Sequence, residues 1–575
     1  MLDTGINYDC IFPGSGPGGG PLASNLARAG YSVLLLEAGS DQSNNTNSEI
    51  VSLFGVAYTD PTLRGDFFAF NFANETRNLQ HNHLIWRRLD GSFHIYYPRG
   101  GTLGGSSAIN AMTMTPGALS HGFNGYLDTI MSNETSWAGQ NNLLVALGAV
   151  SGHIGQSPSD IATNVLADPN GPIPERDQTE GIFGRPLHAD AAWRRFCSRD
   201  YILETARAVD LDGQMQYQLT VQLETLATKV LFADLDDPQK KHRVNGLLTR
   251  EPPGGRAYAR MEVILSGGTF NPPQLLKLSG IGPASELTQL DVDVVVDLPG
   301  VGANLQDNYE VPVVGHAARD FQQPAPDRDA STCTYGAPGD PCVELWKQGR
   351  GPYTVGPPLN SIFRKSAHAA YDERDFFLVG GTFALRGFWP PTDSVPVDPP
   401  NTFGLSTVKI NPQSRSGTVL LRSADPRDTP EIKFHLFKED NAGTELDLNA
   451  ELDMVKWARR AFADVPAPLG LIVPVEPPCP GTPVAEGTCD DETDREWIEN
   501  QIFGHHPTST CAIDADSDSL AVLDSKYRVR GVRGLGVVDA SAFPRVPCLF
   551  PVLLTFMLSE KVTESFWRTR KNGDQ

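Results

Sequence analysis

The sequence lacks both an excess of basic residues and a long apolar run. Lysine and arginine total 47 against 69 aspartates and glutamates, which gives a formal net charge of −22 over 575 residues. Nucleic acids are bound by clustered Lys and Arg that release counterions, so we expect no nucleic-acid partner. The acidity also disfavours an anionic membrane surface. The longest apolar candidate, Val546 to Leu558, is interrupted by two prolines and falls short of the roughly 20 residues that a membrane span needs. The composition favours a globular protein that acts on small neutral molecules and does not bind membranes.

Cysteine is scarce, with 8 residues in the chain, and no C-x-x-C or paired-histidine spacing accompanies it. The sequence therefore predicts no metal site. Two pairs lie close together in loops rich in proline and glycine, namely Cys333 with Cys342 and Cys479 with Cys489. Short-range pairs of this kind are typical of disulfides formed in an oxidising compartment.

The N-terminal residues MLDTGINYD lack the basic and apolar regions of a signal peptide. The chain is thus either intracellular or a mature form whose signal has been removed. N-x-S/T sequons occur at Asn44, Asn74 and Asn133. Together with the cysteine pairs they favour the second alternative, a secreted protein with N-glycan acceptor sites at these asparagines.

The first forty residues have the pattern strand, tight turn, helix, strand. Residues 8–12 are a short apolar run, residues 22–30 carry apolar side chains at helical spacing and end at a glycine, and residues 32–37 (SVLLLE) are continuously apolar. Continuous apolar runs are typical of parallel strands that are buried on both faces. The segment is therefore predicted to be a βαβ unit.

Three glycines in this unit form a dinucleotide-binding fingerprint. Gly14, Gly16 and Gly19 have the spacing G-x-G-x-x-G between the predicted strand and helix. The first permits the tight turn, the second lets the backbone approach a pyrophosphate, and the third allows close helix–strand packing, while the helix N-terminus attracts phosphate. Glu37 ends the second strand, where its carboxylate can accept from ribose hydroxyls. The fingerprint alone does not separate FAD from NAD.

The length exceeds that of one hydrophobic core, so we expect two packed domains. Beyond the first unit, the pattern of apolar residues predicts strands and helices. The strands are Val221–Phe232, Ala259–Ser266, Asp291–Asp297 and Gly417–Arg422, and the helices are residues 272–290 and Leu446–Phe462. The prolines and short alternating runs after residue 311 indicate a mainly antiparallel sheet. We predict a discontinuous α/β Rossmann-like domain of the glutathione-reductase type, with an inserted α+β substrate-binding domain. The first comprises residues 1–150, 195–310 and 498–575, and the second residues 151–194 and 311–497.

Five further segments carry a family resemblance. They are Tyr97–Ala111 (YPRGGTLGGSSAINA), Ser266–Pro283 (SGGTFNPPQLLKLSGIGP), Leu298–Asp307 (LPGVGANLQD), His506–Cys511 (HPTSTC) and Val538–Pro544 (VDASAFP). Together they make the chain similar to the glucose–methanol–choline (GMC) family of FAD-dependent oxidoreductases. The resemblance runs from one end of the chain to the other and is loose between residues 311 and 497.

The resemblance implies FAD, because the glycine-rich run from Gly100 to Gly105 lets the backbone lie against a flat ring. Some family members tether FAD through a histidine, whose matching position here is Ile109. Isoleucine cannot form that bond, so non-covalent FAD is expected. Besides the fingerprint glycines and Glu37, the residues that match FAD-binding positions are Arg99, Thr102, Gly105, Ser106, Asn110, Ala111, Val230, Asp539 and Ala540.

The resemblance also supplies a catalytic base. Family members oxidise an alcohol by passing hydride from the carbinol carbon to flavin N5 while a histidine removes the hydroxyl proton, and the matching residue is His506. Imidazole suits this role because its pKa lies near neutrality. The adjacent His505 lies off the motif.

The second catalytic position of the family, a His or Asn, aligns with Val552. Valine neither accepts a proton nor donates a hydrogen bond. Three side chains could replace the missing partner, namely Ser509, His505 and Asn110. Two other consequences stay open: the substrate needs less assistance, or the flavin site performs other chemistry.

The apolar stretch around Val552 predicts a bulky, apolar or aromatic alcohol, since sugar hydroxyls would lose water without finding partners. Oxygen or another acceptor would reoxidise the flavin, and a monomer is the simplest oligomeric state. The alternative functions are a flavin-dependent lyase, cyclase or decarboxylase, and a non-catalytic binding protein.

Overall fold

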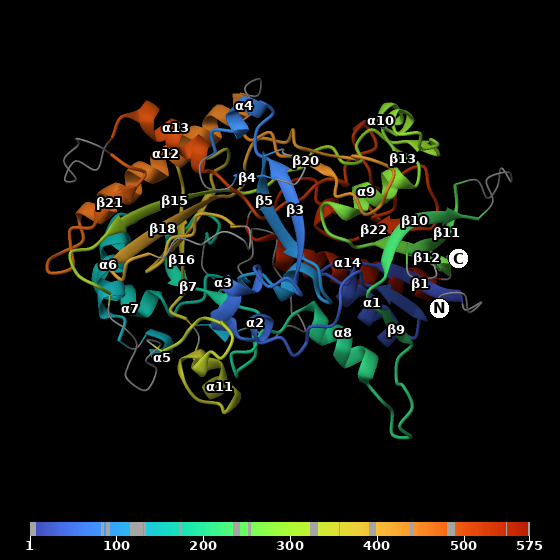
Figure 1. The fold of residues 1–575 in the computed structure, drawn as a ribbon, viewed down its shortest axis with the longest axis horizontal. Coiled ribbons are helices and arrows are strands. Elements are labelled where there is room, and N and C mark those ends of the chain that lie inside the picture. The colour runs from blue at the N-terminus through green and yellow to red at the C-terminus, as the bar shows by residue number, and fades with distance from the viewer. Residues whose placement is uncertain are drawn as a thin grey trace.

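The computed structural model describes residues 7–81, 85–87, 93–114, 130–131, 134–137, 139–171, 175–233, 242–250, 255–321, 332–355, 357–389, 398–437, 442–479, 489–547 and 549–572. Figure 1 shows one large sheet in each half of the molecule, with β3 and β5 between them. Helices α12 and α13 lie over the left-hand sheet, and α1 and α8 lie beside the right-hand one.

The right-hand sheet has seven strands in the order β10-β11-β12-β1-β2-β9, and β22 pairs with β12. Strand β1 runs parallel to both β2 and β12, as a dinucleotide-binding unit requires. All four residues of β2 are buried, which explains its unbroken apolar sequence. The bounds are β1 Asn7–Pro13, β2 Val33–Leu36, β9 Leu219–Gln222, β10 Leu226–Phe232, β11 Val244–Arg250, β12 Arg256–Leu265 and β22 Leu535–Val537, with helices α1 Gly19–Arg28, α8 Ser198–Arg207 and α14 Pro551–Asn572.

The left-hand sheet has six strands in the order β21-β15-β18-β17-β16-β7, and all its pairings are antiparallel. Helices α6 and α12 contribute apolar residues to the core that this sheet shares. The bounds are β7 Gly181–Gly184, β15 Tyr309–His316, β16 Asn360–Arg364, β17 Phe376–Gly381, β18 Thr402–Lys409 and β21 Val473–Glu476, with helices α6 Asn141–Gly152, α12 Ala442–Ala463 and α13 Asp491–Gln501.

A third sheet of order β19-β20-β3-β5-β4 connects segments from early and late in the chain. Its strands are β3 Arg64–Phe70, β4 Ile85–Arg87, β5 Phe93–Gly100, β19 Thr418–Leu420 and β20 Glu431–Lys433. Two small pairs join β6 Ile130–Met131 to β8 Pro186–Leu187, and β13 Ile281–Gly282 to β14 Val296–Asp297. The remaining α-helices are α2 Thr46–Glu49, α3 Phe54–Ala57, α4 Glu75–Asn78, α5 Glu134–Trp137, α7 Ile161–Asn164, α9 Asn271–Leu278, α10 Ala284–Gln289 and α11 Pro341–Lys347.

The structure confirms the first βαβ unit and the long helix predicted at Leu446–Phe462, and it corrects three other predictions. The strand predicted at Val221–Phe232 is divided into β9, which pairs with β2, and β10, which pairs with β11. The helix predicted at 272–290 is broken into α9 and α10, because Gly280 adopts a positive φ of 84° and a short strand follows it. Of the strand predicted at 291–297 only Val296–Asp297 forms. The division of the chain into two domains stays a prediction.

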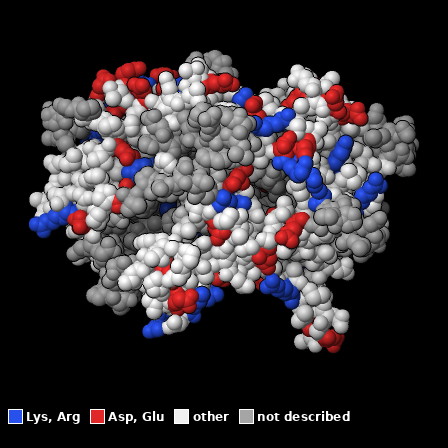
Figure 2. Space-filling model, in the orientation of Figure 1, with Lys and Arg blue, Asp and Glu red and all other residues white. Residues whose placement is uncertain are grey.

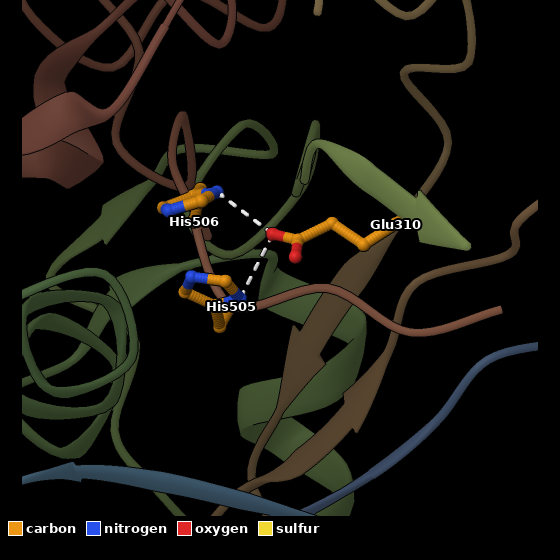
Figure 3. Close-up of side chains that lie close together, drawn as sticks. All are labelled: Glu310, His505 and His506. Atoms are coloured by element: carbon orange, nitrogen blue, oxygen red, sulfur yellow. Dashed lines mark ion pairs between the residues drawn. The ribbon is translucent and has the colours of Figure 1, made fainter. Parts of the chain in front are cut away.

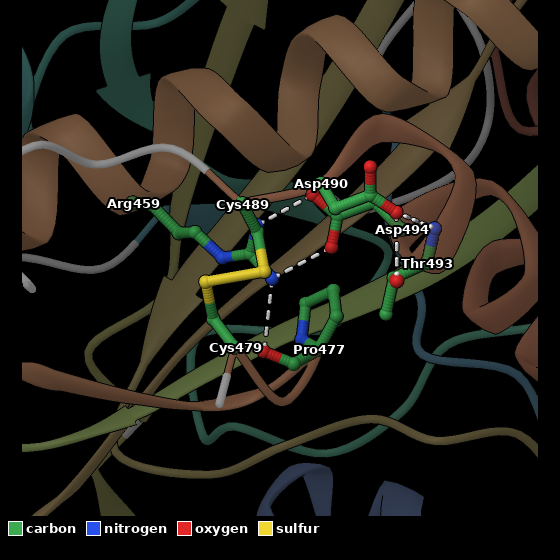
Figure 4. The surroundings of a disulfide bond; sticks show 7 residues. All are labelled: Arg459, Pro477, Cys479, Cys489, Asp490, Thr493 and Asp494. Carbon is green, nitrogen blue, oxygen red and sulfur yellow. Dashed lines mark hydrogen bonds and ion pairs between the residues drawn. A yellow bond between two sulfur atoms is a disulfide. The ribbon is translucent and has the colours of Figure 1, made fainter. Parts of the chain in front are cut away.

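Both predicted disulfides are present, Cys333–Cys342 and Cys479–Cys489. The second lies beside a buried ion pair (Figure 4). Arg459 of α12 donates to both carboxylate oxygens of Asp494 in α13, at 2.6 and 2.8 Å, and to the carbonyl oxygen of Pro477 at 3.0 Å. A single guanidinium therefore connects two helices to the segment that leads into the disulfide.

Charged side chains of both signs are interspersed on the face shown in Figure 2. Acidic atoms gather at the upper left, over α13, whose first turn contains three acidic residues. No helix among the described residues is both long and apolar enough to cross a membrane.

We expect Arg459→Met to destabilise the fold strongly, because it leaves the fully buried Asp494 without a counter-charge. Breaking one partner of a buried pair typically costs about 3–5 kcal/mol. The double variant Arg459→Met/Asp494→Leu should recover much of this loss. Thermal denaturation followed by circular dichroism provides the comparison, and equal melting temperatures for the single and double variants would contradict this account.

Candidate active site

The predicted fingerprint glycines meet different surroundings in the turn between β1 and α1. A Cβ on Gly14 would lie 2.2 Å from the carbonyl oxygen of Ser266, and one on Gly19 would lie 2.2 Å from that of Gly14. A Cβ on Gly16 would meet nothing within 4 Å. The outer two glycines are therefore required for packing, while the middle one borders open space at the start of a helix, as a pyrophosphate requires.

Glu37 lies at the end of β2 with its carboxylate directed back at this turn. It accepts from Ser15 N at 3.2 Å, Ser15 Oγ at 2.5 Å and Gly39 N at 2.9 Å. Burial raises its pKa. The backbone of Ala38 is a further hydrogen-bond partner, so this carboxylate is held by the two loops that follow β1 and β2.

The second glycine-rich loop packs on the first. A Cβ on Gly105 would lie 3.0 Å from the Cα of Gly16, a tight contact, and Gly105 also has a positive φ of 55°, which favours glycine. The Ser106 hydroxyl accepts from Gly100 N at 3.1 Å. Thr102 donates to a backbone carbonyl of the loop after β2 at 2.8 Å. The glycine turn after β1 and the glycine-rich loop at residues 100–105 are therefore in contact, which the sequence alone did not show.

Asn110 is held by a buried cation. Its Oδ1 accepts from Arg195 Nη1 at 2.8 Å and from Met112 N at 3.1 Å, and it lies 3.1 Å from His188 Nε2. Burial, with Arg195 adding to it, lowers the pKa of His188 to about 3, so this ring is neutral. The Asn110 amide is thus locked in the loop, and Ala111 continues that loop half-buried beside it.

The C-terminal motif adds further candidate FAD contacts. Asp539 accepts from Gly268 N at 2.8 Å and from Ser541 N at 2.9 Å, and burial raises its pKa to about 7. The carbonyl oxygen of Ala540, the next residue, accepts a backbone hydrogen bond.

Val230, the residue predicted to contact adenine, is buried in β10, and its N–H donates to Ser279 Oγ at 3.0 Å. Adenine could accept from that N–H only if Ser279 gave way.

The segment that carries His506 is hydrogen-bonded to residues 306–310, which lead into and begin β15. Glu310 and Phe503 exchange two backbone hydrogen bonds, at 2.9 and 3.2 Å, and Thr508 and Gln306 exchange another two, at 2.9 and 3.3 Å. His506 N donates to Asp307 Oδ1 at 2.6 Å. These bonds fix the position of the histidine between the two large sheets.

The His506 ring is buried among aromatic groups. It lies 4.9 Å from the Phe550 ring and 3.8 Å from the His505 ring, as measured between centroids. Burial lowers the pKa of His506 well below its ordinary value, with the nearby His505 and Arg99 adding to the effect. The imidazole is therefore neutral near pH 7 and able to accept a proton.

Both histidines face one buried carboxylate (Figure 3). Glu310 Oε1 lies 2.9 Å from His505 Nδ1 and 3.5 Å from His506 Nδ1. The Glu310 side chain is 1% exposed and that of His505 is 25% exposed.

Asp307 is a second buried carboxylate beneath the histidines. It accepts from the Tyr97 hydroxyl at 2.6 Å, and burial raises its pKa to about 7. Arg99, predicted to contact FAD, donates to the carbonyl oxygen of His505 at 2.9 Å. Arg99 thus helps to hold the segment that carries the two histidines.

Of the proposed substitutes for the missing partner, only His505 lies against His506. The Ser509 hydroxyl is buried and shares a hydrogen bond with Thr508 at 2.9 Å. Val552, in the first turn of α14, packs with Leu553 and Phe556 in an apolar cluster. Ile109 is buried in another small apolar cluster.

Two groups of His, Cys, Asp or Glu among the described residues bring three ligand atoms within 4.8 Å of one another. One contains Cys333 and Cys342, which are joined in a disulfide. The other is Glu310 with the two histidines, whose separations are those of ion-paired side chains. Neither arrangement needs a metal ion to account for it.

Glu310 and Asp307 were not among the site residues predicted from the sequence. Asp307 ends a quoted motif, and Glu310 precedes the apolar run VPVVG. A carboxylate at the start of a strand buried on both faces is a signal, because such groups are almost never buried without a partner.

Comparisons with known proteins agree with this geometry. Two family models described as GMC oxidoreductase match residues 198–310 and 412–559. Glucose methanol choline oxidoreductase atC from Aspergillus terreus is 29% identical, over 98% of this chain and 93% of the relative. An oxygen-dependent choline dehydrogenase from Photobacterium profundum is 28% identical, over 97% of this chain and 92% of that protein.

Among solved structures, pyridoxine 4-oxidase from Mesorbium loti superimposes with a TM-score of 0.70 at 18% identity, covering 98% of this chain and 99% of that one. This likeness confirms the predicted fold class, a Rossmann-like FAD-binding domain with a substrate domain. The fingerprint turn, the two interlocking glycine loops and the matched models lead to one assignment: the chain belongs to the GMC oxidoreductase family and uses FAD as its cofactor.

Proposed function

We propose that the protein oxidises a bulky, apolar or aromatic alcohol, with His506 as the base. The position of His506 carries this proposal: a neutral imidazole, buried beside Phe550, on a loop fixed between the FAD-binding sheet and the antiparallel sheet. FAD, when bound, accepts the hydride from the carbinol carbon. His506 takes the hydroxyl proton, and its low pKa keeps it in the accepting form near neutrality.

The aromatic surroundings of the two histidines support an apolar substrate. Phe550 packs edge-on against Phe377 at 4.9 Å, and Phe388 packs edge-on against His505 at 5.2 Å. Phe377 belongs to an aromatic and aliphatic cluster on β16, β17 and β18. Aromatic rings bind such walls well, whereas each sugar hydroxyl would lose water without gaining a partner.

The FAD is proposed to be dissociable. Ile109 stands at the tethering position, and its side chain packs in an apolar cluster with Ala57 and Leu63. Gly16, Glu37, Gly105 and Asp539 are the residues that we propose to surround the phosphates, ribose and ring.

Oxygen or another electron acceptor would reoxidise the reduced flavin and complete the catalytic cycle.

Secretion is part of the proposal, supported by the two disulfides and by the exposed sequon residues Asn44 and Asn74. The third sequon, Asn133, lies outside the described residues.

A flavin-dependent lyase, cyclase or decarboxylase is the second candidate, because Val552 supplies neither a proton donor nor an acceptor. Anaerobic mixing separates the two functions: net alcohol oxidation bleaches the visible flavin band, while redox-neutral chemistry leaves it unchanged.

His506→Ala should reduce the rate of anaerobic flavin bleaching by about 10²–10⁴-fold, the usual contribution of a positioned acid–base group. His316→Ala is a matched control. His316 is a histidine at the far end of β15, the strand that contains Glu310 near its start. Stopped-flow absorbance gives both rates. If the His506 variant bleached as fast as wild type, another group would have to be the base.

Aryl alcohols should be oxidised with a higher kcat/KM than glucose. An unpaired buried polar group costs about 1–3 kcal/mol, so one desolvated sugar hydroxyl gives a preference of about 5- to 150-fold. Steady-state kinetics with a matched panel of aryl, alkyl and sugar alcohols provides the measurement. Equal kcat/KM values for aryl alcohols and glucose would contradict the apolar site.

Gly16→Ala should weaken FAD binding and leave the apoprotein fold intact, because the new methyl group enters the open space reserved for phosphate. Gly55→Ala is the control, since its Cβ also meets nothing within 4 Å and the residue lies in α3. Flavin retained after dialysis reports on affinity, and apoprotein melting temperature reports on the fold. Full flavin retention in the Gly16 variant would place the pyrophosphate elsewhere.

A further inference from the structure

The buried Glu310 carboxylate has one oxygen, Oε1, aimed at two histidines. The 2.9 and 3.5 Å separations to His505 and His506 both involve Nδ1 atoms (Figure 3). All three of these atoms are buried and lack a hydrogen bond of ordinary geometry. Burying a carboxylate without a partner costs several kcal/mol of free energy. We therefore expect a proton to lie between Glu310 Oε1 and one of the two Nδ1 atoms.

The rest of the surroundings leave the histidines as the nearest charge partners of Glu310. Arg185 is a buried cation whose pKa burial lowers to about 10, with Glu310 acting in the opposite direction. Asp307 and Tyr97 face the carboxylate from the segment before β15 and from β5. Within 4 Å, ion pairs of Glu310 involve His505 and His506 alone among the described residues.

The geometry of His506 then determines which of its nitrogens is the base. A carboxylate next to Nδ1 favours the tautomer that carries hydrogen on Nδ1. The lone pair is left on Nε2. The same carboxylate stabilises the imidazolium that forms once Nε2 has taken a proton, as in other carboxylate–histidine pairs.

We propose that Glu310 is the positioning residue that compensates for valine at position 552, and that His505 competes with His506 for it. The inference rests on the proposed alcohol oxidation. In the step concerned, the alcohol O–H bond breaks and its proton forms an N–H bond at His506 Nε2, while the carbinol C–H electron pair leaves as hydride to FAD. Glu310 keeps its negative charge and balances the new positive charge. His505 lies against the same carboxylate oxygen, at 2.9 Å, and acts electrostatically against the imidazolium of His506.

The test compares the pH profiles of kcat/KM for three variants with the wild type. Glu310→Gln removes the charge that favours imidazolium, so the pKa of His506 falls, the acid limb moves to lower pH, and kcat drops about 100-fold with little change in KM. His505→Gln removes the neighbouring charge that lowers the pKa of His506, so its acid limb moves to higher pH. Glu310→Asp retains the charge and should lie between Gln and wild type in kcat.

Glu451→Gln is the matched control, since Glu451 is an equally buried carboxyl on α12 that bonds to Thr407. Its profile should follow wild type. Shifts in the same direction for Glu310→Gln and His505→Gln, or an unchanged profile in Glu310→Gln, would overturn the inference. Loss of wild-type rate on dialysis against a chelator, restored by Zn²⁺, would also overturn it, because the three atoms would then hold a metal.

A second measurement is independent of turnover. Ring ¹⁵N shifts of labelled histidine, with His506 assigned by its Gln variant, report the tautomer directly. Hydrogen on Nδ1 in wild type that is lost in Glu310→Gln supports the pairing, and hydrogen on Nε2 in wild type contradicts it. If no alcohol bleached the flavin, the proposed reaction would fail while this result still decided whether Glu310 orients His506.

Discussion

The antiparallel exchange between residues 306–310 and 503–508 is the contact on which the site depends. Its four backbone hydrogen bonds join the C-terminal segment to the segment that enters β15. The same pairing brings His505 and His506 to the carboxylate of Glu310 and places Asp307 at the His506 amide. The position of His506 is therefore set by main-chain pairing with residues 306–310 at the start of β15.

The glycine turn of the predicted cofactor site could be read from the sequence, because glycine spacing reflects local backbone requirements. Gly14 and Gly19 were predicted from the turn they make, and their missing side chains are what allow the observed contacts. The two disulfides followed from short sequence separations in the same way. By contrast, the helix predicted at 272–290 overlooked Gly280, whose positive φ ends α9. The error came from giving apolar spacing more weight than a helix-terminating glycine.

The residues around His506 were harder to predict from the sequence, since they come from segments that are far apart in the chain. The partner of His506 lies 196 positions earlier in the chain, on β15, whereas the alignment searched for it at position 552 in α14. No periodicity links these positions. The available signal was energetic: a glutamate at the start of a strand buried on both faces needs a counter-charge, and histidines are among the few groups that can supply one reversibly.

An apolar residue at position 552 is physically compatible with a working base if charge stabilisation comes from the opposite side of the ring. Val552 in α14 packs with Leu553 and Phe556, so a polar side chain at this position would lie among apolar groups. Glu310 acts on Nδ1, so the wall towards the substrate can remain free of polar atoms. In a buried site a carboxylate 3.5 Å from the imidazole interacts far more strongly than it would in water. The charge that stabilises the imidazolium can therefore come from Glu310 of β15, while position 552 in α14 keeps an apolar residue in an apolar cluster.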